Sequence, residues 1–184
     1  MKIDWESIFM NKYPVPGASK EDIDDFKKKV NMPLESDEVK QINESQTVPF
    51  PSSDPLYVDY VPFDPRKWTL PNKPLPENYL DFLKWSNGGS FFNKERSFDQ
   101  FIPCQQVREY LIGYDIPEYM PNVFPFALDG CGNVYLFDMR ENPTNNEFPI
   151  LFVQLGNLRF RDAVLVASTF IGACKGTTNP GDIA

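Results

Sequence analysis

The stretch ALDGCGNVYLFD, residues 127–138, holds the residue types in this sequence that most readily do chemistry. Cys131 stands between two glycines, with Asp129 before them and Asn133 after them. Such residues occur in nucleophile sites, calcium loops and phosphate-binding loops. The 184 residues include no histidine, which excludes the usual Cys/His and Ser/His/Asp arrangements. Cys131 as a nucleophile would therefore depend on a lysine or on the loop amides for activation.

The spacing favours a structural turn over these sites. A dinucleotide-binding loop has the pattern GxGxxG and leads into a helix, whereas here Tyr135 takes the third glycine position and a strand-like run follows. A calcium loop needs oxygen ligands at alternate positions, and Cys131 interrupts that alternation. Asp-Gly is a favoured hairpin turn, and glycine permits positive φ. We therefore expect no metal and no cofactor, and we interpret four residues as a turn: Asp129, Gly130, Gly132 and Asn133.

The cysteines and acidic residues indicate no other site. Cys104, Cys131 and Cys174 are an odd, widely spaced set without a CxxC pair, so neither a disulfide framework nor a zinc site is indicated. We expect all three thiols to be reduced and largely buried, with Cys174 on the inner face of a C-terminal helix. No spacing among the 26 acidic residues singles out a catalytic pair, so the sequence predicts no catalytic residue.

Composition narrows the class of protein. Hydrophobic residues make up 41% and aromatic residues 15%, which suits a globular core, and 184 residues suit one domain. The formal net charge of -8 argues against a nucleic-acid-binding surface and favours a basic partner. The N-terminus lacks the apolar core of a signal peptide, and no apolar stretch reaches the roughly 20 residues of a membrane span. We expect a cytoplasmic protein that does not bind membranes.

Periodicity and capping signals predict the elements that position these residues. Helices are expected over residues 19–33, 36–43, 76–86, 103–113 and 160–176. Strands are expected in a hairpin over 90–101 and over 122–128, 133–139 and 148–155. Asn87, Gly88 and Gly89 supply a turn that ends the third helix. This order predicts a single α+β domain over residues 1–184, with a mostly antiparallel β-meander packed against helices.

A proline-rich segment interrupts this pattern. Eight prolines fall within residues 49–76, where they disfavour regular structure. The run DPLYVDYVPFDPRKW within it is rich in aromatic residues, so we expect residues 34–74 to form an insert that lies on the domain.

Acidic and aromatic residues alternate in this run, as they do at binding surfaces. The candidate partner-binding residues are Asp54, Tyr57, Asp59, Tyr60, Phe63, Asp64 and Trp68. The alternative is that these rings only pin a loop to the core.

Three stretches together resemble the SUKH superfamily. They are LPENYLDFLKWSNGG, FPFALDGCGNVYLFD and PILFVQLGN, followed by an amphipathic segment, and the resemblance covers about residues 75–175. It implies an α+β domain without catalytic residues. Bacterial members are mostly immunity proteins that neutralise a toxin, and eukaryotic members are regulatory interaction modules. Residues 34–74 are longer and richer in proline than the family pattern.

The leading hypothesis is a non-enzymatic protein-binding module, an immunity protein that binds and neutralises a bacterial toxin. An acidic surface suits a basic toxin domain. Two alternatives stay open. One is a regulatory scaffold in cell-wall or glucan synthesis, and the other is an uncharacterised enzyme that uses Cys131 or carboxylates.

Overall fold

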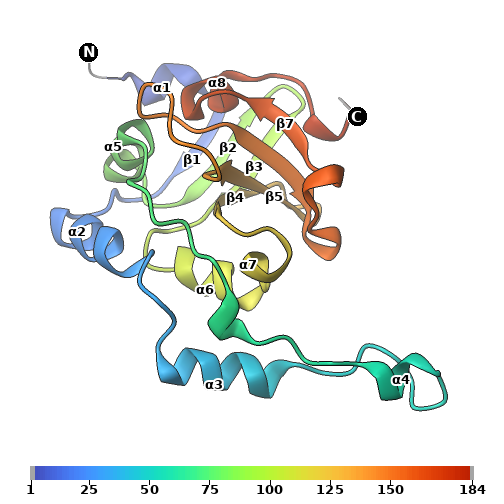
Figure 1. Ribbon diagram of the computed structural model, residues 1–184. Helices are drawn as coiled ribbons and strands as arrows, with labels where there is room; N and C mark the ends of the chain where they lie inside the picture. Colours follow the sequence, from blue (N-terminus) through green and yellow to red (C-terminus); the bar gives the residue numbers. More distant parts are fainter. Residues whose placement is uncertain (1–2, 183–184) are drawn as a thin grey trace.

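Seven strands form one antiparallel sheet, in which each strand lies beside its neighbours in sequence (Figure 1). The computed structural model describes residues 3–182. The strands are β1 (Asn11–Pro14), β2 (Gly89–Asn93), β3 (Arg96–Phe101), β4 (Val123–Leu128), β5 (Asn133–Asp138), β6 (Ile150–Gln154) and β7 (Val164–Ala167). This order confirms the predicted antiparallel meander.

The chain has eight helices within the described residues. They are α1 (Trp5–Ile8), α2 (Lys20–Lys29), α3 (Ser36–Ser45), α4 (Leu56–Asp59), α5 (Glu77–Trp85), α6 (Val107–Gly113), α7 (Ile116–Tyr119) and α8 (Phe170–Lys175). Helices α5 and α8 cover one face of the sheet, while α6 and α7 cover the other. Short 3-10 turns are η1 (Pro65–Lys67), η2 (Leu155–Asn157), η3 (Phe160–Asp162) and η4 (Pro180–Asp182). Side chains alternate along β5, so Tyr135 and Phe137 join the core with α5 and α8, whereas Val134 and Leu136 join the core with α6 and α7. The α+β class is confirmed.

The larger core consists mainly of aromatic rings. Tyr79 and Phe82 of α5 are fully buried, and so are Phe126 of β4 and Phe170 of α8. Their rings meet edge to face, with centroids 5.4 Å apart for Tyr79 and Phe170 and 5.7 Å apart for Phe82 and Phe170. Each such buried side chain contributes about 1.5–3 kcal/mol to folding, so this core makes a rigid scaffold for the loops around it.

The first long helix begins where the sequence predicts. The Ser19 hydroxyl accepts a hydrogen bond from the Asp22 amide at 3.1 Å, and the Asp22 carboxylate accepts one from the Ser19 amide at 2.9 Å. This capping box starts α2, and Ile23 and Phe26 are buried on its inner face.

The C-terminal segment differs from the predicted helix over residues 160–176. Residues 164–167 form strand β7, which pairs with β6 through Phe152 and Val164, and the helix α8 begins only at Phe170. The β-branched residues at 164 and 166 find an unpaired sheet edge, where strand pairing satisfies their backbone groups. Thr169 then caps α8 by accepting a hydrogen bond from the Gly172 amide at 3.0 Å.

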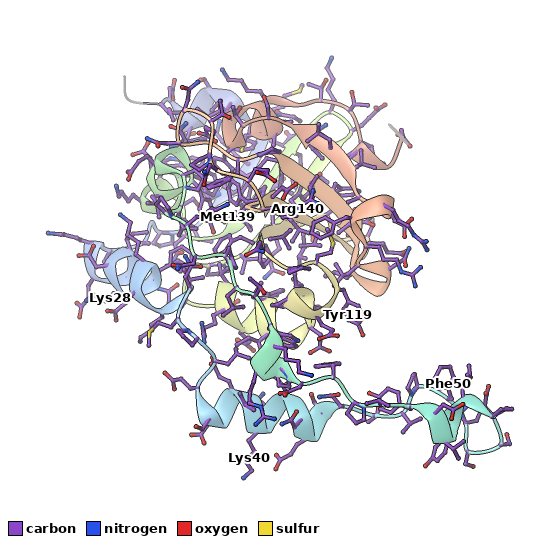
Figure 2. The ribbon with its side chains drawn as sticks, in the orientation of Figure 1. Lys28, Lys40, Phe50, Tyr119, Met139 and Arg140 are labelled. Atoms are coloured by element: carbon purple, nitrogen blue, oxygen red, sulfur yellow. The ribbon has the colours of Figure 1, made fainter. Side chains whose placement is uncertain are left out.

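The proline-rich segment projects away from the sheet (Figure 1). Residues 47–62, here called the arm, leave the end of α3, form α4 and return to η1, and none of them is buried. Figure 2 shows Phe50 in the arm, well apart from Met139 and Arg140 in the body. The prediction that residues 34–74 lie on the domain is therefore wrong for the arm. The backbone hydrogen bonds of its tip are local, from the Asp54 amide to the Pro51 carbonyl oxygen and from the Tyr57 amide to the Asp54 carbonyl oxygen.

Candidate partner-binding surface

The DGCGN stretch forms the turn between β4 and β5. One oxygen of Asp129 accepts hydrogen bonds from the amides of Cys131 and Asn133 at 2.8 and 2.9 Å, and the other accepts one from the Asn133 side chain at 2.7 Å. Gly130 and Gly132 have φ of 79° and 89°, which favour glycine. The polar atoms of Asp129 are thus used within the turn itself. Residues 3–182 contain no group of three or more His, Cys, Asp or Glu that could hold a metal ion.

The exposed thiol in this turn corrects one sequence-based expectation. Cys104 and Cys174 are buried, as predicted, and Cys174 faces the core from α8. Cys131 is exposed, because the two positive-φ glycines around it turn the chain outward at the end of the hairpin. All three thiols are free.

The second predicted turn ends α5. Gly88 and Gly89 have φ of 118° and 101°. The Asn87 side chain accepts a hydrogen bond from the Cys104 amide at 2.9 Å and donates one to Gln105 at 2.8 Å. A side chain at Gly89 would meet the Tyr13 carbonyl oxygen at 2.5 Å, so glycine allows β1 to approach the sheet closely. These residues shape the scaffold.

The structure divides the seven candidate binding residues into two groups. Asp54, Tyr57 and Asp59 lie at the tip of the arm, in and beside α4, while Phe63, Asp64 and Trp68 lie where the arm rejoins the body. Tyr60 is half-buried and lies between the two groups, where the chain leaves the tip and runs back to the body.

The base of the arm is fixed to the body by Trp68. Its indole nitrogen donates a hydrogen bond to the Glu118 carboxylate of α7 at 2.8 Å, and its ring lies against Phe63, with centroids 5.6 Å apart. Asp64 is held by Arg66 through two hydrogen bonds of 2.8 and 3.0 Å, which lower the pKa of the Asp64 carboxyl. At these positions the alternative interpretation, a loop pinned to the body, describes the contacts.

The tip of the arm exposes apolar side chains. Val58 and Val61 are 82% and 81% exposed, and Leu56 and Tyr57 are 51% and 41% exposed. The Asp54 carboxylate accepts a hydrogen bond from the Leu56 amide at 2.8 Å and so fixes the start of α4. Sequence reasoning missed Leu56, Val58 and Val61, although apolar residues between closely spaced prolines were a usable signal.

The arm is also uniformly acidic. From Gln41 to Pro65 the sequence has no lysine or arginine, while it has Glu44, Asp54, Asp59 and Asp64. Since Arg66 pairs with Asp64, Asp54 and Asp59 carry the negative charge near the tip. Acidic groups around exposed apolar side chains match the composition of a protein-binding surface with a basic partner.

Arg108 of α6 orients the part of the chain that carries the arm. Its guanidinium donates to the carbonyl oxygens of Lys29 at 2.8 Å and Met32 at 2.9 Å, in the link between α2 and α3. It also binds the Glu38 carboxylate of α3. At the other end of α3, the Gln46 side chain donates to the Phe63 carbonyl oxygen at 3.0 Å and closes the base of the arm.

Comparison with known proteins identifies the body of the chain but not the arm. Residues 68–172 match the family model described as SMI1 / KNR4 family (SUKH-1), and the match begins after the arm at Trp68. None of the curated proteins compared with the sequence matches it. Within residues 3–182, every helix is too short or too polar to cross a membrane. By its match over more than half of its length, the chain belongs to the SMI1 / KNR4 family (SUKH-1).

Proposed function

We propose that this chain is a non-enzymatic protein-binding module, an immunity protein that binds a bacterial toxin through its arm and neutralises it. The observation that carries the proposal is the acidic, apolar tip of the arm, which lies outside the family match. Family membership supports a role in protein binding, as either an immunity protein or a regulator of cell-wall assembly.

The exposed side chains of the tip provide the binding energy in this proposal. Contiguous apolar side chains that remain exposed in a free protein commonly mark an interaction site. Burial of Leu56, Tyr57, Val58 and Val61 against a partner would remove them from water, and aromatic anchors such as Tyr57 often dominate binding. The α4 turn holds Leu56, Tyr57 and Val58 together, so part of the ordering cost is met before binding.

The charge of the arm selects the class of partner. Asp54 and Asp59 at the tip add to a chain with a net charge of -8, which attracts a positively charged protein surface. A toxin that acts on nucleic acid presents such a surface. An acidic arm that occupies it would compete with the nucleic acid and block the toxin.

The surroundings of Cys131 support the non-enzymatic part of the proposal. The Asp129 carboxylate, two residues before Cys131, already accepts three hydrogen bonds within the turn. That carboxylate is therefore poorly placed to act as a base for the thiol.

The test compares the native chain with a variant whose residues 53–60 are replaced by a Gly-Ser stretch of equal length. Both are tagged and purified from the native cell, and a protein retained by the native chain alone is then purified and titrated by calorimetry. A partner that is toxic when expressed alone and harmless beside the native chain supports immunity. A partner that builds the cell wall supports the regulatory alternative instead.

Single substitutions localise the contact. Tyr57→Ala is expected to weaken binding by about 2 kcal/mol or more, while Tyr13→Ala, at a still more exposed tyrosine on β1, leaves binding unchanged. Equal affinities of the native chain and the Gly-Ser variant for the same partner would overturn the arm as the binding site.

A further inference from the structure

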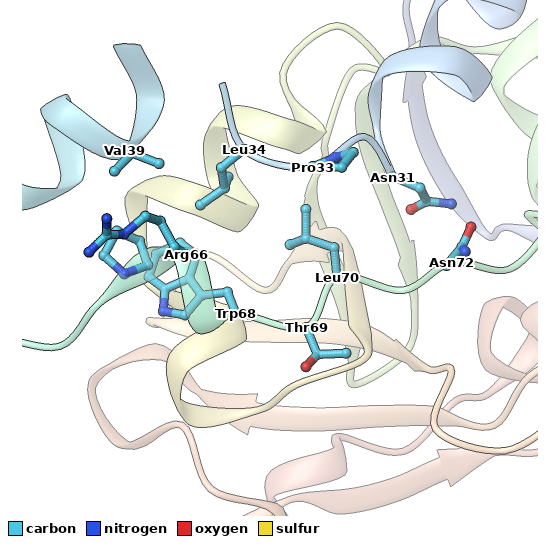
Figure 3. A pocket seen from close by; sticks show the side chains of 10 residues that line it. Asn31, Pro33, Leu34, Val39, Arg66, Trp68, Thr69, Leu70 and Asn72 are labelled. Atoms are coloured by element: carbon cyan, nitrogen blue, oxygen red, sulfur yellow. The ribbon is translucent and has the colours of Figure 1, made fainter. Parts of the chain in front are cut away.

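An open groove of about 490 Å³ lies at the base of the arm (Figure 3). One wall is the link between α2 and α3 with Val39 of α3, and the other is the extended chain after η1. Figure 3 shows Leu34 and Leu70 pointing towards each other from the two walls, with Trp68 beside them. The groove therefore has an apolar centre that no part of the described chain covers.

One end of the groove holds an unsatisfied hydrogen-bond acceptor. The Asn31 side chain donates to the Lys73 carbonyl oxygen at 3.1 Å, but its own side-chain oxygen is buried and accepts no hydrogen bond from the described residues. In Figure 3 the amides of Asn31 and Asn72 face each other at this end. A buried acceptor without a donor is costly, so a rotation of the Asn31 amide towards the groove, where a ligand supplies an N–H group, gains a hydrogen bond. An apolar segment of polypeptide offers both the side chains and the N–H groups.

The same chain carries such a segment but does not place it in its own groove. The arm leads away from the body in Figure 1, and its tip exposes Leu56, Val58 and Val61. Each chain thus has one uncovered apolar segment and one uncovered apolar groove.

We propose that the groove receives the arm of a second copy of this chain, so that two copies form a dimer with exchanged arms. A two-fold axis between antiparallel arms places each tip against the base of the other arm, and both contacts form at once.

The charges at the two ends of the arm agree with this arrangement. The tip carries Asp54 and Asp59. The base carries Arg66 in the groove and Lys67 in the hollow next to it, which Asp64 and Glu118 also line. Arg66 is already paired with Asp64, which leaves Lys67 as the cation at the base for the tip of the second copy. Opposite charges thus meet in the antiparallel arrangement, whereas a parallel one would set the acidic tips together.

This dimer does not depend on the proposed toxin partner. It uses the same arm, however, and so it would hide the binding surface until a partner competes for it. The test uses the purified chain alone, and its failure therefore leaves the proposed function untouched.

Sedimentation equilibrium across a range of protein concentrations tests the proposal. The native chain is expected to dimerise, and Val58→Asp in the arm and Leu34→Asp in the groove are each expected to raise the dimer dissociation constant at least about tenfold. Val15→Asp, at an exposed apolar residue next to β1, is the matched control and is expected to leave the dimer intact. Thermal melts of each variant show that it is folded.

Mixing the two weakened variants makes the test specific. The Leu34→Asp chain keeps an intact arm and the Val58→Asp chain keeps an intact groove, so the mixture should form a heterodimer with one native contact. Asp59 at the tip and Lys67 at the base are both exposed, and they give a second test that leaves the groove unchanged. Asp59→Lys and Lys67→Asp should each weaken the dimer. A chain that carries both substitutions should dimerise as the native chain does. A native chain that stays monomeric, or a dimer that Val58→Asp leaves unchanged, overturns the proposal.

Discussion

Arg108 of α6 donates hydrogen bonds to both carboxylate oxygens of Glu38 of α3, from Nε at 2.6 Å and from Nη2 at 2.7 Å. Both side chains are mostly buried, with 17% and 25% of their surfaces exposed. The pair ties the helix that leads into the arm to the body, and the match to the family model covers only one of its two partners.

We expect Glu38→Gln to lower the free energy of unfolding by about 1–2 kcal/mol, because the charged Arg108 then faces a neutral amide with one acceptor oxygen in place of a carboxylate with two. Asp37→Asn, at the exposed neighbouring position, is the control and should have little effect. Urea unfolding measures both. Equal effects of the two substitutions would show that the pair does not stabilise the fold.

The same pair should make stability depend on pH. The hydrogen bonds from Arg108 lower the pKa of Glu38 in the folded chain. A lowered folded-state pKa adds stability that is complete above the ordinary pKa of a glutamic acid and is lost as the pH falls through the folded-state value. The native chain should thus lose more stability in this acidic range than Glu38→Gln does, as urea unfolding at a series of pH values will show.

Trp68 should affect stability, whereas the tip of the arm should not. Trp68→Phe removes the hydrogen bond to Glu118 but keeps an aromatic ring against Phe63, so a loss of about 0.5–1.5 kcal/mol is expected. Val58→Ser, at a side chain that is 82% exposed, should leave the melting temperature within error of the native value. Calorimetric melts compare the two. A lower melting temperature for Val58→Ser would mean that the arm packs against the body in solution.

The two glycines of the DGCGN turn should differ in their tolerance of alanine. Both have positive φ, so either substitution should cost about 1 kcal/mol in backbone strain. At Gly130 the added Cβ would also lie 2.9 Å from the Asp99 carboxylate, while at Gly132 it meets nothing within 4 Å. Gly130→Ala should therefore destabilise more than Gly132→Ala.

Gly113 provides the control for these two changes. It ends α6 without positive φ and has open space around its Cβ position, so Gly113→Ala should be neutral or slightly stabilising. Urea unfolding of the three variants gives the order, and a Gly132→Ala variant as unstable as Gly130→Ala would contradict it.

The central elements could be predicted because local signals and tertiary contacts agree there. The Ser19–Asp22 capping box starts α2, and Asn87 with its two glycines ends α5, as the sequence indicates. Continuous apolar runs mark β5 and β6, whose two faces are buried in two different cores. At these places each level of structure favours the same conformation.

The edges of the fold could not be predicted in the same way. β1 is a four-residue strand that is mostly exposed and ends at a proline, and it is held by contacts with other segments, above all its pairing with β2. Residues 164–167 have helical spacing, yet they form β7 because β6 offers a free edge. In both segments the strand conformation depends on pairing with a neighbouring strand, and such pairing cannot be predicted from the local sequence.

The candidate site was only partly predictable for a related reason. The run from Asp54 to Trp68 is visible as aromatic and acidic, but the sequence does not show that the structure splits it into an exposed tip and a packed base. The split depends on Glu118, which lies 50 positions beyond Trp68 in the chain. Arg108, which holds Glu38 of α3 from 70 positions away, gives no signal in its own neighbourhood either.

The three thiols should separate clearly in reactivity. Cys131 is exposed, whereas Cys104 and Cys174 are buried. Burial, with a smaller effect of Asp22, raises the pKa of Cys104 to about 11, and burial raises the pKa of Cys174 well above its ordinary value. Because the thiolate is the reactive form, a thiol reagent at mildly alkaline pH should label one cysteine per folded chain quickly and all three after unfolding. Cys131→Ser should abolish the fast phase and leave the slow one, as absorbance and mass spectrometry will show.

The same variant also tests the enzyme alternative, since a structural turn predicts that Cys131→Ser keeps full affinity for the partner and full protection against it. A loss of function with an unchanged melting temperature would instead give the thiol a chemical role.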